Sequence, residues 1–121
     1  MPFDQIKSAV ILWFANQSKE DIEELKTFGH ELRKKGINIT FLAFHPIKKL
    51  SPDMQPNELH QLCCKGDFNL FDKPKSSSLI NLINQSFDLL INGCLDDNKF
   101  IHTICALSKA KFRIGVYNSN N

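Results

Sequence analysis

The chain has 121 residues, of which 42% are hydrophobic and 23% charged, and its formal net charge is +2. These values are typical of one soluble globular domain and exclude a disordered or fibrous protein. So small a net charge gives no argument for nucleic acid or an anionic membrane as a partner.

Four cysteines stand at positions 63, 64, 94 and 105, and none belongs to a C-x-x-C pair. This spacing suits neither a tetrahedral zinc site nor a redox motif. A chain that can build a core does not need a disulfide framework, so we expect free thiols and a cytoplasmic location. Residues 1–8 do not resemble a signal peptide, and no apolar window of about 18 residues predicts a transmembrane helix.

The first predicted strand is the apolar run 9–15. Its continuous hydrophobicity indicates a strand that is covered on both faces, as in a parallel sheet. A capping residue, Ser18, then predicts a helix that ends near Gly36. The second predicted strand covers residues 37–44 and completes a β-α-β unit.

The middle of the chain is harder to interpret because three prolines interrupt residues 47–66. Apolar residues at helical spacing predict a short helix over residues 57–65. Residues 68–71 are a predicted short strand, after which Ser76 or Ser77 is expected to begin a helix.

The strand predicted over residues 87–92 leads into a polar turn, where Asp96 or Asp97 is expected to cap the next helix. A last strand is predicted over 112–117. We expect the chain ends, residues 1–7 and 118–121, to be frayed.

Strands that alternate with helices predict a single α/β domain over residues 1–121. Its sheet is expected to be doubly wound, mainly parallel and five-stranded, in a Rossmann-like or flavodoxin-like fold with helices on both faces. The predicted strand order is 3-2-1-4-5, with 2-1-3-4-5 as the alternative. Ligands of such sheets bind beyond the carboxyl ends of the strands. The candidate ligand-binding residues there are Asn16, Gln17, Ser18, His45, Asn92, Cys94, Asp96 and Asp97.

The sequence of the turn after the first strand argues against two kinds of binding site, one for nucleotide phosphates and one for magnesium. It contains no glycine, which a dinucleotide or P-loop site needs for close approach of the backbone to phosphate. It also lacks the acidic pair that holds magnesium in response regulators. We therefore predict no cofactor.

Asp96 and Asp97 are adjacent carboxylates that can hold a cation, but helix capping and solvent exposure are the favoured interpretation. Cys94 lies near a predicted helix N-terminus, which lowers the pKa of a thiol. A nucleophilic cysteine also needs a base, for which only His45 or His102 is available, so packing is the favoured role of Cys94. We predict neither catalytic residues nor a metal site.

Three segments carry a resemblance to a known family: Phe87-Asp88-Leu89-Leu90-Ile91-Asn92, Ala106-Leu107-Ser108-Lys109-Ala110-Lys111-Phe112-Arg113-Ile114-Gly115 and Phe68-Asn69-Leu70-Phe71-Asp72-Lys73-Pro74-Lys75. They resemble recurrent segments of an uncharacterised family of bacterial α/β, Rossmann-like proteins. The likeness spans most of residues 8–117. Because that family has no assigned activity, the resemblance implies a fold and no chemistry.

The last strand-helix-strand unit, about 30 residues long, is also similar to the N-terminal domain of heptosyltransferase-like glycosyltransferases. Those enzymes carry a Gly-Asp turn after their first strand, where this chain has Asn16-Gln17. They also use a second domain for the sugar nucleotide. The similarity therefore implies the fold and leaves the transferase site unmatched.

The leading hypothesis is a non-enzymatic cytoplasmic domain that binds a partner protein or forms a homodimer. Its basis is that each site considered lacks part of the residue set that its chemistry needs. The alternative hypothesis is a domain that binds a small molecule or sugar phosphate at the turns after residues 15, 44 and 92. Neither nucleic acid nor a membrane is expected as a partner, because the basic residues are dispersed.

Overall fold

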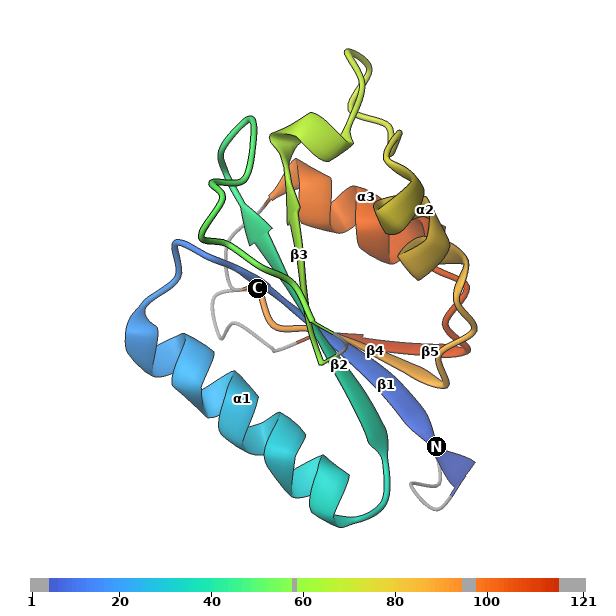
Figure 1. Cartoon of the computed structure of the whole chain (residues 1–121). Helices are drawn as coiled ribbons and strands as arrows, with labels where there is room; N and C mark the ends of the chain where they lie inside the picture. The colour runs from blue at the N-terminus through green and yellow to red at the C-terminus, as the bar shows by residue number, and fades with distance from the viewer. Residues whose placement is uncertain (1–4, 58, 95–97, 116–121) are drawn as a thin grey trace.

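The structure, a computed structural model, describes residues 5–57, 59–94 and 98–115. Over these residues the chain forms an α/β fold with one sheet and three α-helices (Figure 1). The elements in chain order are β1 (Ser8–Phe14), α1 (Lys19–Lys34), β2 (Asn38–His45), β3 (His60–Cys64), the 3₁₀ turn η2 (Lys65–Asp67), α2 (Ser77–Asn84), β4 (Leu89–Asn92), α3 (Lys99–Leu107) and β5 (Phe112–Gly115).

The five strands lie in the order β3-β2-β1-β4-β5, and each neighbouring pair is parallel. The predicted fold class is confirmed. The first of the two predicted strand orders also holds, with residues 60–64 as the third strand in place of the predicted residues 68–71. The chain moves outward from β1 to β3, returns to the other side of β1, and moves outward again to β5. The boundary between β1 and β4 is therefore the switch point of the sheet, where α/β proteins bind ligands.

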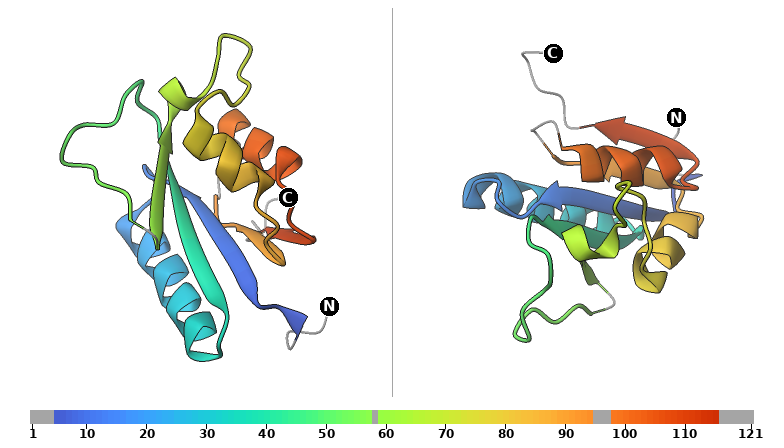
Figure 2. Two further views of the ribbon diagram at one scale, coloured as in Figure 1. Left: turned by 45° about the vertical axis from the view of Figure 1, so that its right-hand side comes forward. Right: turned by 90° about the horizontal axis from the view of Figure 1, so that it is seen from above.

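Helices cover both faces of the sheet, but unequally (Figures 1 and 2). Helix α1 packs on one face, mainly over β1 and β2. Gly29 lets it approach closely, because a Cβ atom at this position would lie 2.5 Å from ring carbons of Phe41 in β2. Helices α2 and α3 pack on the opposite face. Strand β5 is exposed along its length, and among the described residues no helix covers it on the α1 side.

Each face of the sheet has its own core, because neighbouring residues of a strand point to opposite faces. The α1-side core contains Ile6, Ala9, Ile11, Trp13, Leu25, Leu32, Ile37, Ile39, Phe41, Ala43, Leu89 and Ile91. The core between the sheet and α2 and α3 contains Val10, Leu12, Leu42, Phe44, Cys63, Phe68, Leu79, Ile83, Phe87, Leu90, Cys94, Ile101, Ile104 and Ala110. Strands β1, β2 and β4 supply both cores, which explains their unbroken apolar sequences.

Local signals set the helix ends. The Ser18 hydroxyl accepts a hydrogen bond from Asp21 N at 3.1 Å, as predicted for the start of α1. At its other end Gly36 has φ +91°, and Gly36 N and Ile37 N donate to carbonyls of the last turn in a Schellman arrangement. Ser76 caps α2.

The predicted cap of α3 was wrong. The N-cap residue is Asn98, whose side-chain oxygen accepts hydrogen bonds from Phe100 N and Ile101 N at 3.0 and 3.1 Å. Asp96 and Asp97 precede this cap and lie outside the described residues. The amide of Asn98 satisfies the same free N–H groups that a carboxylate was expected to satisfy.

Two predictions in the middle of the chain were also wrong. Residues 60–64 form the edge strand β3 and not part of a helix, because pairing with β2 satisfies their backbone groups. The side chain of Asn57 accepts hydrogen bonds from the N–H groups of Leu59 and His60 and directs the chain into this strand. Residues 68–71 are not a strand but belong to a tight turn closed by the bridge between Phe68 and Pro74.

The chain ends lie largely outside the described residues, which exclude 1–4 and 116–121. The predicted fraying of both ends therefore stays a prediction. Close to the N-terminus, Ile6 is already part of the α1-side core.

Candidate functional site

The carboxyl ends of β1 and β4 meet at the switch point through the side chain of Gln17. Its Oε1 accepts from Phe14 N at 2.7 Å, and its Nε2 donates to the carbonyl oxygen of Gly93 at 3.0 Å. The side chain thus fixes the turn after β1 against the end of β4. Gln17 thus lies where the turns after β1 and β4 meet.

Three of the other predicted residues of this region have structural roles, namely Ser18, Asn92 and Cys94. Asn16 and Ser18 are exposed, and Ser18 caps α1. The Asn92 side chain accepts from Cys94 N at 2.9 Å and shapes the turn after β4. Cys94 is 8% exposed and belongs to the core under α2 and α3, which agrees with a packing role. Asp96 and Asp97 lie outside the described residues.

His45 is separated from the other candidates. It ends β2, and β1 lies between β2 and β4 in the sheet. Burial lowers the pKa of its imidazole, which favours the neutral ring. In register it pairs with Cys64 of β3, where burial raises the pKa of the thiol. A raised pKa disfavours the reactive thiolate, so this pair lends no support to a nucleophilic cysteine.

A cavity of about 330 Å³ lies beside the switch point, on the α1 side of the sheet. Its floor is Ile91 of β4 and Gly93, the first residue after that strand, with Ile114 and Gly115 of β5. Its wall is one stripe of α1, formed by Asp21, Glu24, Leu25 and Phe28. We call this cavity, together with the Gln17 turn, the switch-point crevice. It exists because no helix of the described chain covers β5 on this face.

A second surface was not predicted. The turn formed by residues 69–72, here called the exposed turn, projects from the top of the molecule in Figure 1. Leu70 is 98% exposed and Phe71 is 82% exposed. Both residues follow Asn69, whose side chain accepts hydrogen bonds from Phe71 N and Lys73 N at 2.8 and 3.1 Å. The backbone of this turn is thus held in place while its two apolar side chains meet water.

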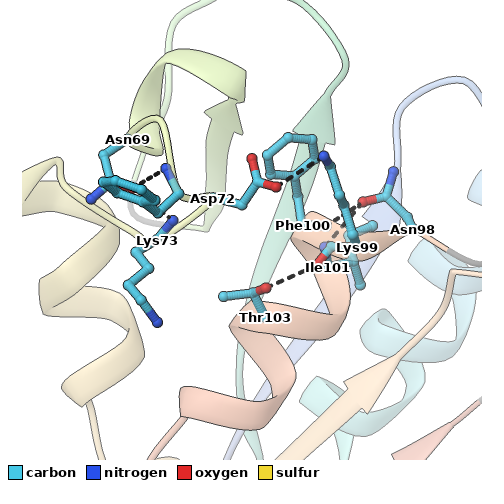
Figure 3. A network of polar contacts seen from close by, with 9 residues as sticks. Asn69, Asp72, Lys73, Asn98, Lys99, Phe100, Ile101 and Thr103 are labelled. Atoms are coloured by element: carbon cyan, nitrogen blue, oxygen red, sulfur yellow. Dashed lines mark hydrogen bonds and ion pairs between the residues drawn. The ribbon is translucent and has the colours of Figure 1, made fainter.

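The exposed turn is also attached to helix α3 (Figure 3). Lys99 Nζ forms an ion pair with Asp72 at 2.9 Å and lies 5.2 Å from the centre of the Phe100 ring. Asp72 has φ +59°, an uncommon value outside glycine, and ends the turn. An exposed ion pair adds little stability, but this one joins the turn to the helix start that Asn98 caps.

A groove of about 530 Å³ runs between the exposed turn and the start of α3. Three lysines line it, Lys48, Lys65 and Lys75. Phe68 and Phe100 also line it, with ring centroids 4.8 Å apart. We call it the lysine groove. Its lysines come from three separate segments of the chain. No local sequence pattern therefore predicts that they line one groove.

A signal for the exposed turn did exist. Asn69 and the run Asp72-Lys73-Pro74 are turn-forming residues, and they flank Leu70 and Phe71. Two apolar residues within such a run indicate apolar side chains at the tip of a turn. The strand predicted over residues 68–71 rests on the apolar Leu70 and Phe71 and leaves out the turn-forming residues on either side of them.

Within the described residues, no group of three or more His, Cys, Asp or Glu side chains has an arrangement that could hold a metal ion. In the same part of the chain, no helix is both long and apolar enough to cross a membrane.

The comparisons with known proteins identify a family and no activity. A family of unknown function, DUF6913, matches residues 2–121. The chain belongs to this family. A search of curated proteins and a search of solved structures gave no match. The predicted resemblance to an uncharacterised α/β family is confirmed to that extent.

Proposed function

We propose that the protein is a non-enzymatic cytoplasmic domain that binds a partner protein through the exposed turn and the lysine groove. The observation that carries the proposal is the exposure of Leu70 and Phe71 on a turn held by Asn69 and by the ion pair between Asp72 and Lys99. Burying an exposed Leu or Phe side chain yields roughly 1.5–3 kcal/mol. Because the turn is already ordered, little of that energy is spent on ordering it.

The groove beside the turn defines the chemistry of the partner. Three lysine side chains favour carboxylates, and the rings of Phe68 and Phe100 favour apolar groups. The expected partner therefore presents a segment with acidic and apolar residues, together with a pocket for Phe71. A recessed groove suits a protein segment better than a bilayer, whose flat surface does not enter it.

Several narrower expectations belong to this proposal. Cytoplasmic location rests on four free cysteines, and the bacterial origin rests on the sequence resemblance alone. Similarity to heptosyltransferase N-terminal domains likewise remains a prediction. A homodimer is a competing outcome, because Phe112 and Ile114 of the edge strand β5 are 44% and 41% exposed.

Selection from a phage-displayed library of random peptides tests the proposal. We expect wild-type protein to select peptides rich in acidic and apolar residues. Phe71→Ser should weaken their binding about tenfold or more, which is what losing one buried aromatic side chain predicts. Leu107→Ser is the matched control, because Leu107 is also exposed, at 48%, but lies at the end of α3.

Charge is tested in the same assay. Lys65→Glu and Lys75→Glu should each weaken the selected peptides, whereas Lys109→Glu, outside the groove, should not. The proposal is overturned if the selected peptides bind Phe71→Ser as well as wild type. It is equally overturned if the exposed turn is instead needed for binding to anionic vesicles or single-stranded DNA, or for a dimer in light scattering.

A further inference from the structure

We infer that the switch-point crevice is a binding site for a small organic cation, namely a protonated amine on an apolar body. This site is separate from the exposed turn and from the proposed partner. Its volume of about 330 Å³ lies at the lower end of the range of small-molecule pockets. Its place between the carboxyl ends of β1, β4 and β5 is the place where α/β sheets bind ligands.

The helical wall of the crevice combines charge with apolar surface. Asp21, Glu24, Leu25 and Phe28 stand at positions i, i+3, i+4 and i+7 of α1, which places them on one face of the helix. No lysine, arginine or histidine is among the described residues that line the cavity. Neither carboxylate forms an ion pair or a side-chain hydrogen bond with another described residue. The two acids therefore remain available to a cation.

The other polar side chain of the crevice, Gln17, does not change the preference for a cation. Both ends of the Gln17 amide are already engaged, with Phe14 N and with the Gly93 carbonyl. The Phe28 ring is 42% exposed and can meet an ammonium group through its face. Ile91 and Ile114 offer an apolar floor for the body of the ligand.

The same lining disfavours the predicted sugar-phosphate ligand at this crevice. Two carboxylates repel a phosphate, and no cation among the described lining residues offsets them. Gly93 explains why the wall and floor come so close. A Cβ at this position would lie 2.6 Å from Leu25 Cδ1 and 2.7 Å from the Leu12 carbonyl oxygen. The glycine thus serves close packing of the turn after β4 against Leu25 of α1 and not a phosphate.

Titration of ¹⁵N-labelled protein with phenethylamine, followed by backbone-amide NMR, tests the inference. Phenethyl alcohol and 3-phenylpropionate are the neutral and anionic controls of matched shape. Of the three compounds, we expect only phenethylamine to shift the amide signals of Gly93, Leu25 and Gly115. The double variant Asp21→Asn/Glu24→Gln should bind it about tenfold more weakly. Glu20→Gln is the matched control, since it removes a carboxylate from the same first turn of α1 but outside the cavity.

A second variant tests whether binding needs the open cavity as well as the two carboxylates. Ile114→Trp keeps both carboxylates and fills the cavity, so it should abolish the shifts while the rest of the spectrum shows a folded protein. The inference is wrong if 3-phenylpropionate binds as well as phenethylamine. It is also wrong if Glu20→Gln weakens binding as much as the double variant, or if phenethylamine leaves Gly93 and Gly115 unshifted in wild type.

Discussion

At the scale of single residues, Asp88 joins three segments of the sheet. Its carboxylate accepts hydrogen bonds from Lys7 N at 2.8 Å and Ser8 N at 3.3 Å, and it pairs with Lys111 Nζ at 3.3 Å. The backbone hydrogen bond from Lys7 and, less strongly, the Lys111 ammonium lower the pKa of this carboxyl. One side chain thus holds the start of β1 beside the start of β4 and the approach to β5.

Asp88→Asn should therefore lower Tm at neutral pH. Because the pKa is lowered in the folded state, the charged form stabilises the fold above the ordinary carboxyl pKa of about 3.9, and this contribution is lost as pH falls through the folded-state pKa. The Tm difference between wild type and variant should shrink over that acidic range. Thermal unfolding followed by circular dichroism at a series of pH values measures it.

Lys111→Met is the control for this prediction. It removes the ion pair but keeps both backbone hydrogen bonds, so its effect on Tm should be the smaller one. An effect of Lys111→Met as large as that of Asp88→Asn would contradict this ranking. So would a Tm difference for Asp88→Asn that does not change with pH.

At the scale of elements, the start of α3 is the point where the exposed turn and the fold are coupled. Asn98 caps the helix, and the next residue, Lys99, pairs with Asp72 of the turn. Loss of the cap frees the first turn of α3. We therefore expect any fraying there to loosen the exposed turn as well.

Asn98→Ala should cost about 1 kcal/mol of unfolding free energy, the usual cost of losing an N-cap side chain. Urea denaturation measures this value. Asn98→Asp, which keeps an acceptor, should recover most of it. Asn84→Ala at the exposed end of α2 should cost less, since its side chain makes no hydrogen bond with another described residue. An equal loss of unfolding free energy in Asn98→Ala and Asn84→Ala would contradict the capping role of Asn98.

The elements also show which parts of the fold can be predicted from sequence. Strands β1, β2 and β4 are buried on both faces, so their apolar runs stand out locally. Strand β3 does not stand out in the sequence, because residues 60–64 place His, Leu and Cys on one face and Gln and Cys on the other. They become a strand by pairing with β2. Such tertiary contacts have no counterpart in a local pattern.

At the scale of the whole molecule, the strand order predicted the position of the switch-point crevice but not its chemistry. Gln17 lines it as expected. The acids that define its charge come from one face of α1, and they become neighbours of β4 and β5 only once α1 packs. The lysine groove likewise needs three distant segments to meet. Topology was thus predictable from sequence, whereas the side chains that line the crevice and the groove were not.

The two surfaces differ in charge and position. The lysine groove lies between the exposed turn and the start of α3, beyond the end of β3, whereas the switch-point crevice lies over β4 and β5 on the opposite face of the sheet. Three lysines and the carboxylate of Asp72 line the first, and the carboxylates of Asp21 and Glu24 line the second. The two proposals therefore concern separate surfaces of one fold and can be tested independently.

Backbone-amide NMR of ¹⁵N-labelled wild-type protein, titrated with the tightest peptide selected on it, tests the central proposal most directly. The proposal predicts shifts at Asn69 to Lys73, at Lys65 and Lys75, and at Phe100, while Gly93 and Gly115 stay in place. Shifts centred on β5 or on the switch-point crevice, with the exposed turn unchanged, would contradict it.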